Sequence, residues 1–158
     1  MTSKRLGRQT VRLGSPVSVL SYANIGGKQE AQGPLAGYFD ELNQDAYFGQ
    51  KSWEKGESAM QQFALRRAME KGGLIPEDLD YVLAGDLLNQ CIGTSFSLRD
   101  FKIPFYGLYG ACSTMGESLS LAALLIDGGF ASIVAAMTSS HFCTAERQYP
   151  KAGIFRQQ

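Results

Sequence analysis

The turn from Gly110 to Gly116 carries residue types that could support nucleophilic chemistry. Cys112 follows two small residues, Gly110 and Ala111, and precedes a run that predicts a helix. A thiol at the first turn of a helix lies near the partial positive charge of unpaired backbone N–H groups, which favours the thiolate. Small neighbours permit a sharp turn that presents the side chain to a cavity. The sequence is equally compatible with a buried, inert thiol, because free cysteines are among the most buried residues.

Three further polar residues could join such a site. His141, in the string TSSHFC, is the single histidine and therefore the one imidazole base available. A dyad with Cys112 would require hydrogen-bond reach, which a sequence leaves open, and the residues favour a loop histidine with structural hydrogen bonds. Asp86 and Asn89 follow the end of a predicted strand, where α/β folds commonly bind ligands. The alternative is that they cap the helix that follows.

Alternating β-like and helical runs must position these residues. The pattern predicts strands over residues 16–25, 80–88, 103–109 and 133–137, and helices over 52–71, 94–101 and 113–127. The strands after the first helix are continuous apolar runs, which are typical of a sheet covered on both faces. The order therefore indicates an α/β fold with a parallel or mixed sheet.

The first helix has clear end signals. Ser52 can cap its first turn, Glu54 lies near its positive end, and Gly72-Gly73 end it. Its apolar stripe is expected to pack on the sheet and consists of Ala59, Met60, Phe63, Ala64 and Ala68. The polar, glycine-containing segment 27–51 precedes this helix. We expect it either to be functional or packed against a neighbour, or to be a surface excursion with its own small core.

The helix at 113–127 has almost no polar face over its later turns. A helix that is apolar all round is buried on all sides, so this one should lie between two layers. A chain of 158 residues with this few strands supplies one of those layers. The sequence therefore suggests half of a larger two-layered assembly.

Composition excludes several classes of function. Lys and Arg total 15 and so do Asp and Glu, which argues against nucleic acid as a main partner. A single histidine excludes most histidine-based metal sites, and we expect neither metal nor cofactor. Cys91, Cys112 and Cys143 contain no CxxC pair, which favours reduced thiols, with Cys91 and Cys143 as packing residues.

Membrane signals are weak. The longest strongly apolar stretch, Leu119 to Ile126, is far shorter than the roughly 20 residues that a transmembrane helix needs. The basic N-terminus is not followed by the apolar core of a signal peptide. We therefore expect a protein kept inside the cell that could still lie on a membrane through a partner.

Several strings resemble a known family. Leu79 to Val82, the GAC turn at 110–112 and the strand IVAAM resemble the N-terminal half of the thiolase-like condensing-enzyme fold. The resemblance is closer still to a family of thiolase-like sporulation proteins, over roughly Pro16 to Gln148. The strings that carry it are GPLAGYFDE, FGQKSWEK, LAGDLLNQ, GACSTMGESLSLAALLIDGGFA and TSSHFCTAERQ.

This resemblance implies a fold and an organisation. It implies an α/β half-domain over 1–148 with a mixed, mostly parallel sheet, helices and a buried central helix. Residues 149–158 form an atypical tail. The second half of the fold, which supplies the catalytic His or Asn residues of the enzymes, is expected to be missing.

The resemblance also implies a function. Proteins of this family bind dipicolinic acid and assist its uptake into the developing spore. They act as peripheral subunits of a membrane transport complex, on the cytoplasmic side of the spore inner membrane. The expected partners are dipicolinic acid, alone or as its calcium chelate, the membrane subunits, and a second copy in a homodimer. Cys112 matches the nucleophile position of the enzymes, and His141 matches a residue of the sporulation family.

A pocket for dipicolinate, a flat dianion, needs N–H donors and an apolar wall. The helix start at Cys112 offers such donors, and aromatic residues nearby could form the wall. The expected ligand-binding residues are Cys112, Ser113, Thr114, Asp86, Asn89, His141 and Phe142, with Tyr106 and Tyr109 as further wall candidates. Two alternatives remain: an acyltransferase with Cys112 as nucleophile, and a partial, non-functional copy that only docks onto partners.

Overall fold

The computed structural model describes residues 4–87, 91–141 and 143, and it is built on a small parallel sheet. The sheet consists of β5 (Tyr81–Gly85), β6 (Phe105–Gly107) and β7 (Val134–Thr138) in the order β6-β5-β7. Both pairings are parallel. The central strand β5 is a continuous apolar run, and its middle residues Val82, Leu83 and Ala84 are at most 2% exposed. The predicted α/β fold with a parallel sheet is confirmed.

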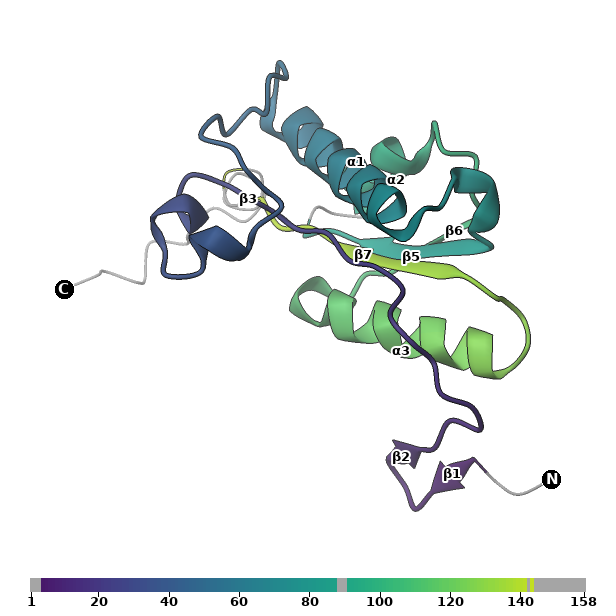
Figure 1. The fold of residues 1–158 in the computed structure, drawn as a ribbon. Helices are drawn as coiled ribbons and strands as arrows, with labels where there is room; N and C mark the ends of the chain where they lie inside the picture. The colour runs from purple at the N-terminus through teal and green to yellow at the C-terminus, as the bar shows by residue number, and fades with distance from the viewer. Residues whose placement is uncertain (1–3, 88–90, 142, 144–158) are drawn as a thin grey trace.

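Helices cover both faces of this sheet (Figure 1). The helices α1 (Trp53–Gly72) and α2 (Ile92–Leu98) lie on one face, and α3 (Thr114–Asp127) lies on the other. Successive side chains of β5 point to opposite faces of the sheet, so the core has two parts. Val82 and Ala84 pack in a cluster with Leu65 of α1 and Leu98 of α2. Leu83 points the other way and packs with Ala122 of α3.

The ends of α1 are as the sequence predicts. The Ser52 hydroxyl accepts a hydrogen bond from the backbone N–H of Lys55, and Gly73 ends the helix with a φ of 65°. The predicted apolar stripe is wrong, because α1 buries a different face from the one that the stripe marks. Its five residues are half-buried, whereas the buried ones are Gly56, Glu57, Gln61, Leu65 and Met69. A count of apolar residues misses this face because two of its members, Glu57 and Gln61, are polar side chains that make hydrogen bonds to other segments.

The predicted first strand is mostly absent. From 16–25 only Ile25 is in a ladder, as part of β3 (Ile25–Gly26), which pairs with β4 (Glu41–Leu42) outside the main sheet. Val19, Leu20 and Tyr22 are 65–74% exposed. β-branched and aromatic residues favour strands because they pack on a half-buried pleated surface, and this segment has no such surface. The Ser21 hydroxyl instead donates to the Ala68 carbonyl of α1.

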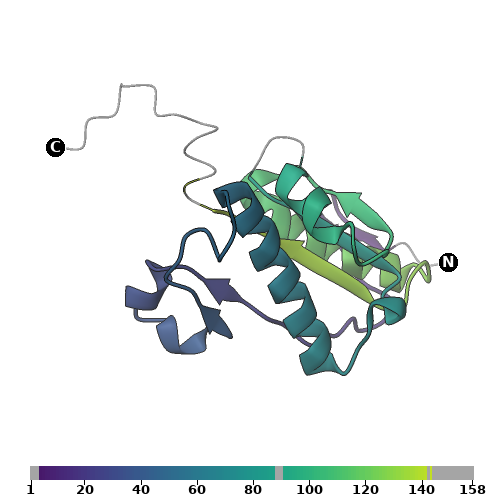
Figure 2. The same ribbon diagram turned by 90° about the horizontal axis from the view of Figure 1, so that it is seen from above.

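The segment 27–51 packs beside α1, away from α2 (Figure 2). It contains two short 3-10 turns, η1 (Glu30–Gln32) and η2 (Ala36–Tyr38). The Tyr47 ring lies 5.6 Å from that of Trp53, and the Phe48 ring lies 6.2 Å from that of Phe63. The segment is therefore anchored to a neighbouring helix through aromatic contacts.

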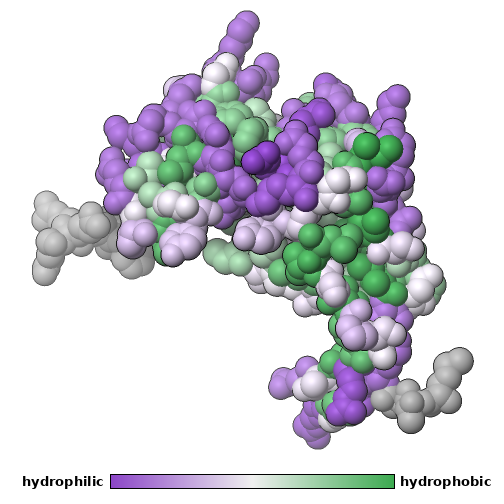
Figure 3. All heavy atoms as spheres, in the orientation of Figure 1, coloured by the Kyte–Doolittle hydropathy of each residue, from purple (hydrophilic) through white to green (hydrophobic). Residues whose placement is uncertain are grey.

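The helix α3 is covered on one side only. Thr114, Ser118 and Ala122, each one turn apart, form its buried face against the sheet. Met115, Leu119 and Leu124 are 41–50% exposed, and Figure 3 shows an apolar surface over this helix. The expected burial on all sides is thus wrong for this chain, because among the described residues a single sheet packs against the helix. The remaining described elements are η3 (Pro76–Asp78), η5 (Ala111–Ser113) and a hairpin of β1 (Arg5–Leu6) and β2 (Thr10–Val11).

Candidate functional site

The carboxyl ends of the three parallel strands bring the predicted site residues to one edge of the sheet. Asp86 follows β5, the segment leading to Cys112 follows β6, and Ser139 to His141 follow β7. The Leu108 N–H donates to the Ala84 carbonyl, and the Ser139 N–H donates to the Gly85 carbonyl. These bonds continue the ladder past the strand ends. Asn89 and Phe142, also predicted for the site, lie outside the described residues.

Gly85 lets the segment after β6 approach β5 closely. A Cβ placed on Gly85 would lie 2.0 Å from the Leu108 carbonyl oxygen and 3.0 Å from Cγ2 of Thr114. No side chain fits there, so the route from β6 to Cys112 depends on this glycine. Thr114 packs against the same point and is fully buried. Its hydroxyl oxygen has no hydrogen-bond partner among the residues that the structure describes.

Cys112 lies in η5, directly before α3, and its side chain is exposed. The turn is tight: the Ser113 hydroxyl donates to the Gly110 carbonyl at 2.8 Å, and Ala111 has a φ of 49°. A non-glycine residue in the left-handed region is uncommon and often marks a functional turn. The buried, inert alternative for Cys112 is wrong. The thiol is presented outward at the start of a 14-residue helix.

His141 makes a structural hydrogen bond. Its Nε2 lies 2.7 Å from the Ala46 carbonyl oxygen in the segment before α1. A carbonyl oxygen only accepts, so Nε2 is the donor in this bond. The contact ties the residues after β7 to the 27–51 segment. A direct contact between His141 and a ligand stays a prediction.

Asp86 has the capping role that the sequence offered as an alternative. Its carboxylate is 1% exposed. Its Oδ2 accepts hydrogen bonds from the Thr94 N–H at 2.6 Å and from the Thr94 hydroxyl at 2.5 Å. The carboxylate thereby satisfies an unpaired N–H group in the first turn of α2.

A buried polar cluster beneath this edge was missed by the sequence analysis. Gln61 of α1 contacts Thr94 and Ser97 of α2 and Ser139 after β7, and Ser139 also contacts Glu57. Glu57 and Gln61 are 2% and 3% exposed. The missed signal was their four-residue spacing with Leu65 and Met69, which places all four on one helical face.

Cys91 has the packing role predicted for it. It is 6% exposed, and its Sγ donates to the Leu108 carbonyl oxygen at 3.1 Å. Burial raises the pKa of the Cys91 thiol, and the nearby negative charge of Asp86 raises it further. Cys91 is therefore kept as a neutral thiol, in contrast to the exposed position of Cys112.

The two predicted wall tyrosines are both exposed, at 51% for Tyr106 and 56% for Tyr109. The Tyr106 ring lies 5.4 Å from the ring of Tyr81, the first residue of β5. That contact places the Tyr106 ring beside the amino end of the sheet. Tyr106 is therefore an unsuitable wall for a site at the carboxyl edge, whereas Tyr109 precedes the Cys112 turn directly.

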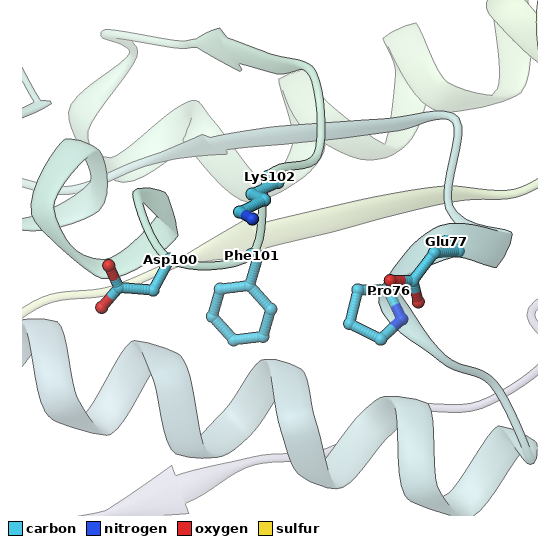
Figure 4. Close-up of a pocket in the computed structure, with 5 residues that line it drawn as sticks. All are labelled: Pro76, Glu77, Asp100, Phe101 and Lys102. Carbon is cyan, nitrogen blue, oxygen red and sulfur yellow. The ribbon is translucent and has the colours of Figure 1, made fainter.

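A separate surface pocket lies at the amino ends of the strands (Figure 4). Pro76, Glu77, Asp100, Phe101 and Lys102 line it. The guanidinium carbon of Arg66 lies 4.7 Å from the centre of the Phe101 ring beside it. Both lining segments lead into strands β5 and β6 from the amino side. The pocket therefore belongs to the edge opposite the one that carries Cys112.

Two other kinds of site are absent from the described ranges. No helix there is both long enough and apolar enough to cross a bilayer. Those ranges also contain no group of three or more His, Cys, Asp or Glu side chains placed to hold a metal ion.

A parallel sheet between helices, with a cysteine at the turn into the helix on one face, defines a thiolase-like α/β unit. The crystal structure of 3-oxoacyl-[acyl-carrier-protein] synthase III from Aquifex aeolicus VF5 is similar to 56% of this chain and 30% of that chain, with a TM-score of 0.51 and 21% identity. This similarity shows the shared fold.

The sequence profile of the family described as Stage V sporulation protein AD (SpoVAD) matches residues 7–155. Stage V sporulation protein AD of Bacillus subtilis (strain 168) is 42% identical over 146 residues. The chain belongs to this family. The alignment covers 92% of this chain but 43% of the relative, so the chain spans less than half of the relative's length. The profile match extends past residue 148, where the sequence analysis places the end of the half-domain.

Proposed function

We propose that this chain contributes a binding site for dipicolinic acid, alone or as its calcium chelate, in a sporulation protein that assists uptake of that acid into the developing spore. The protein acts as a peripheral subunit beside membrane partners on the cytoplasmic side of the spore inner membrane. Membership of the sporulation family supports the role, and the carboxyl edge of the sheet is the place where the ligand would bind.

One observation carries this proposal. The start of α3 combines an exposed Cys112 with a fully buried Thr114 hydroxyl that has no partner among the described residues. The positive end of the α3 dipole favours an anion, while the N–H groups of Ser113 and Thr114 bond to the Gly110 and Ala111 carbonyls. A buried hydroxyl favours a partner. A carboxylate of dipicolinate at this turn would supply the anion and would also be a hydrogen-bond acceptor for the Thr114 hydroxyl. His141 and Tyr109 flank the same edge from the segments after β7 and β6.

Ligand-induced stabilisation tests the proposal. Dipicolinate at a large excess over its Kd should raise the melting temperature of the full-length protein, because a ligand that binds only the folded state stabilises it by about 2.7 kcal/mol at 100 times Kd. Isophthalate, which has the same two carboxylates but no ring nitrogen, and benzoate should give smaller shifts. Calcium added with dipicolinate distinguishes the free acid from the chelate.

A variant pair locates the site. Cys112→Trp places a bulky ring at the start of α3 and should reduce the dipicolinate shift, whereas Ser120→Trp, at an exposed position further along the same helix, should not. Equal shifts with dipicolinate and benzoate contradict specificity. An unchanged shift in Cys112→Trp contradicts this location. No shift with any ligand favours a protein that only docks onto partners.

The exposure of Cys112 supports a second candidate, an acyltransferase. In that reaction the Cys112 thiolate attacks the carbonyl carbon of an acyl-CoA thioester. A new carbon–sulfur bond forms to Cys112 as the bond to CoA breaks, and CoA leaves as a thiolate that takes up the proton lost by Cys112. Peptide mass analysis after incubation with acyl-CoA should then find one acyl group on Cys112 and none in Cys112→Ser. An unmodified Cys112 at high acyl-CoA concentration excludes this candidate.

A further inference from the structure

The buried polar cluster around Gln61 lies at the carboxyl edge of the sheet, on the face covered by α1. It joins α1 and α2 to the segments that follow β5 and β7. Its members come from α1, α2, the end of β5 and the end of β7. They are fully or almost fully buried except for the half-buried Ser139. They are Glu57, Gln61, Asp86, Thr94, Ser97 and Ser139.

The direction of each hydrogen bond in this cluster follows from its two carboxylates. A carboxylate oxygen only accepts, so the Thr94 hydroxyl donates to Oδ2 of Asp86, as the Thr94 N–H does. The Ser139 hydroxyl donates to Oε1 of Glu57 at 2.6 Å. A hydroxyl has one proton, so both hydroxyl oxygens can offer Gln61 only lone pairs. The Gln61 atom that faces them must therefore be the donor Nε2.

The two hydrogens of Gln61 Nε2 are thus directed to Thr94 and to Ser139, and through them to Asp86 and Glu57. Oε1 of Gln61 lies 2.6 Å from the Ser97 hydroxyl, whose one proton is also within reach of the Thr94 carbonyl oxygen at 2.8 Å. No other neutral side chain of this length supplies two donors on one atom and an acceptor beside it. A carboxylate of the same shape would place an acceptor against two oxygens that have already given their protons to other groups.

We propose that Gln61 is a positioning residue for the candidate site. Its amide sets the hydrogen-bond direction of the cluster and so holds the segments after β5 and β7, which carry Asp86 and Ser139 to His141, in the geometry that binds the ligand. The inference rests on the proposed dipicolinate site for its binding readout. Its effect on the two segments can be measured without any ligand.

The test compares two variants of Gln61 in the full-length protein. Gln61→Glu keeps the shape but replaces the donor atom, and Gln61→Met removes all polar atoms at similar length. Gln62→Glu is the matched control, because Gln62 also joins α1 to α2, through the Ser97 carbonyl at 3.1 Å, but contacts neither hydroxyl that donates to a carboxylate. Hydrogen exchange and dipicolinate Kd are measured for each protein well below its melting temperature.

Gln61→Glu and Gln61→Met should speed hydrogen exchange in the segment Ser139–His141 while the middle of β5 stays protected, and Gln62→Glu should not. The same two variants should weaken dipicolinate binding by about tenfold or more, since each loses at least one hydrogen bond to a directed hydroxyl. The Kd of Gln62→Glu should match the wild type.

The pH dependence separates the two Gln61 variants. The titratable groups that contact Gln61's partners or lie beside them are Glu57 from α1, Asp86 after β5 and Cys91 before α2, and His141 follows Ser139 in the chain by two residues. Their titration affects every variant, so the ratio of variant to wild-type Kd is compared. This ratio should fall for Gln61→Glu between about pH 8 and about pH 6, because protonation restores one donor, and should stay constant for Gln61→Met.

Each outcome decides one point. Folded Gln61 variants with wild-type exchange at Ser139–His141 overturn the positioning role whether or not dipicolinate binds. A wild-type protein that does not bind dipicolinate refutes the proposed function, while the exchange data still test the positioning role of Gln61.

If Gln61→Glu does not fold, Ser139→Ala removes the same link to Glu57 with a smaller change. It should give the same exchange and the same loss of affinity, and wild-type values for both would overturn the inference.

Discussion

At the scale of single residues, Gly85 determines whether the turn to Cys112 can form. A methyl group on Gly85 would meet the Leu108 carbonyl oxygen at 2.0 Å, and neither backbone segment can move without breaking the ladder between β5 and β6. We expect Gly85→Ala to destabilise the protein by about 3 kcal/mol or more, at the upper end of overpacking costs.

Gly116 gives the matched control, since it lies in α3 with nothing within 4 Å of an added Cβ. Gly116→Ala should raise stability by about 0.5–1 kcal/mol, because alanine loses less entropy in a helix. Chemical denaturation of both variants measures the difference. Equal effects of the two substitutions would contradict the close approach at Gly85.

A second residue-scale prediction concerns Asp127, which ties the N-terminal hairpin to the end of α3. Its carboxylate, 2% exposed, accepts from Lys4 Nζ at 2.7 Å and from the N–H groups of Gly14 and Ser15. These bonds, that of Lys4 first, hold the pKa of Asp127 below its ordinary value of 3.8. Because the folded pKa is lowered, the stabilisation is present above about pH 4 and is lost as the pH falls through the folded pKa.

The protection factors of the amides at residues 5–15, which are exchange rates corrected for the intrinsic effect of pH, should therefore be higher at neutral pH and fall in acid. Asp127→Asn should show the lower protection at neutral pH, because the amide loses the charge that pairs with Lys4. Asp100→Asn is the control, since Asp100 pairs with Arg99 on the open surface, where ion pairs contribute little. Slow exchange at residues 5–15 in Asp127→Asn would show that the hairpin is held by other contacts.

At the scale of elements, α1 shows that a buried face can differ from the apolar face. Leu65 is 5% exposed and packs in the main core cluster, whereas Met60, in the predicted stripe, is half-buried. Leu65→Ala should cost about 2–5 kcal/mol, the range for leucine truncation in a core. Met60→Ala should cost clearly less, because fewer buried contacts are lost. Thermal unfolding compares the two, and an equal or larger loss in Met60→Ala would favour the sequence-based stripe.

The elements also show what could be predicted from the sequence. Ser52 and Gly73 end α1 through interactions with their near neighbours, and the apolar run of β5 needs no partner to be recognised. The failures depend on distant residues. The segment 16–25 contains strand-forming residues but has no ladder beyond Ile25, and Glu57 is buried because Ser139, far along the chain, bonds to it. The candidate edge was predictable because parallel strands place their carboxyl ends together, but the cluster around Gln61 was not.

At the scale of the whole molecule, the two faces of α3 differ in what covers them. Ala122 is 7% exposed and packs with Leu83 of the sheet, whereas Leu119 and Leu124 are 50% and 43% exposed. Together with Met115 and Leu121, and with Phe130 shortly after the helix ends, they form what we call the exposed apolar face of α3. The chain spans 43% of the length of its Bacillus subtilis relative, and a face of this kind on an isolated chain promotes association.

Charge on that face should therefore change association without changing the fold. In the isolated 158-residue chain, Leu119→Lys with Leu124→Lys should lower the weight-average mass in sedimentation at a given concentration, because charged side chains oppose apolar contact between molecules. The melting temperature should change little, since both side chains are already about half exposed. Ala122→Lys, one turn away on the buried face, should instead unfold the chain, because it would bury a charge with no partner. Unchanged association in the double variant, with the fold retained, would show that the exposed apolar face of α3 does not drive self-association.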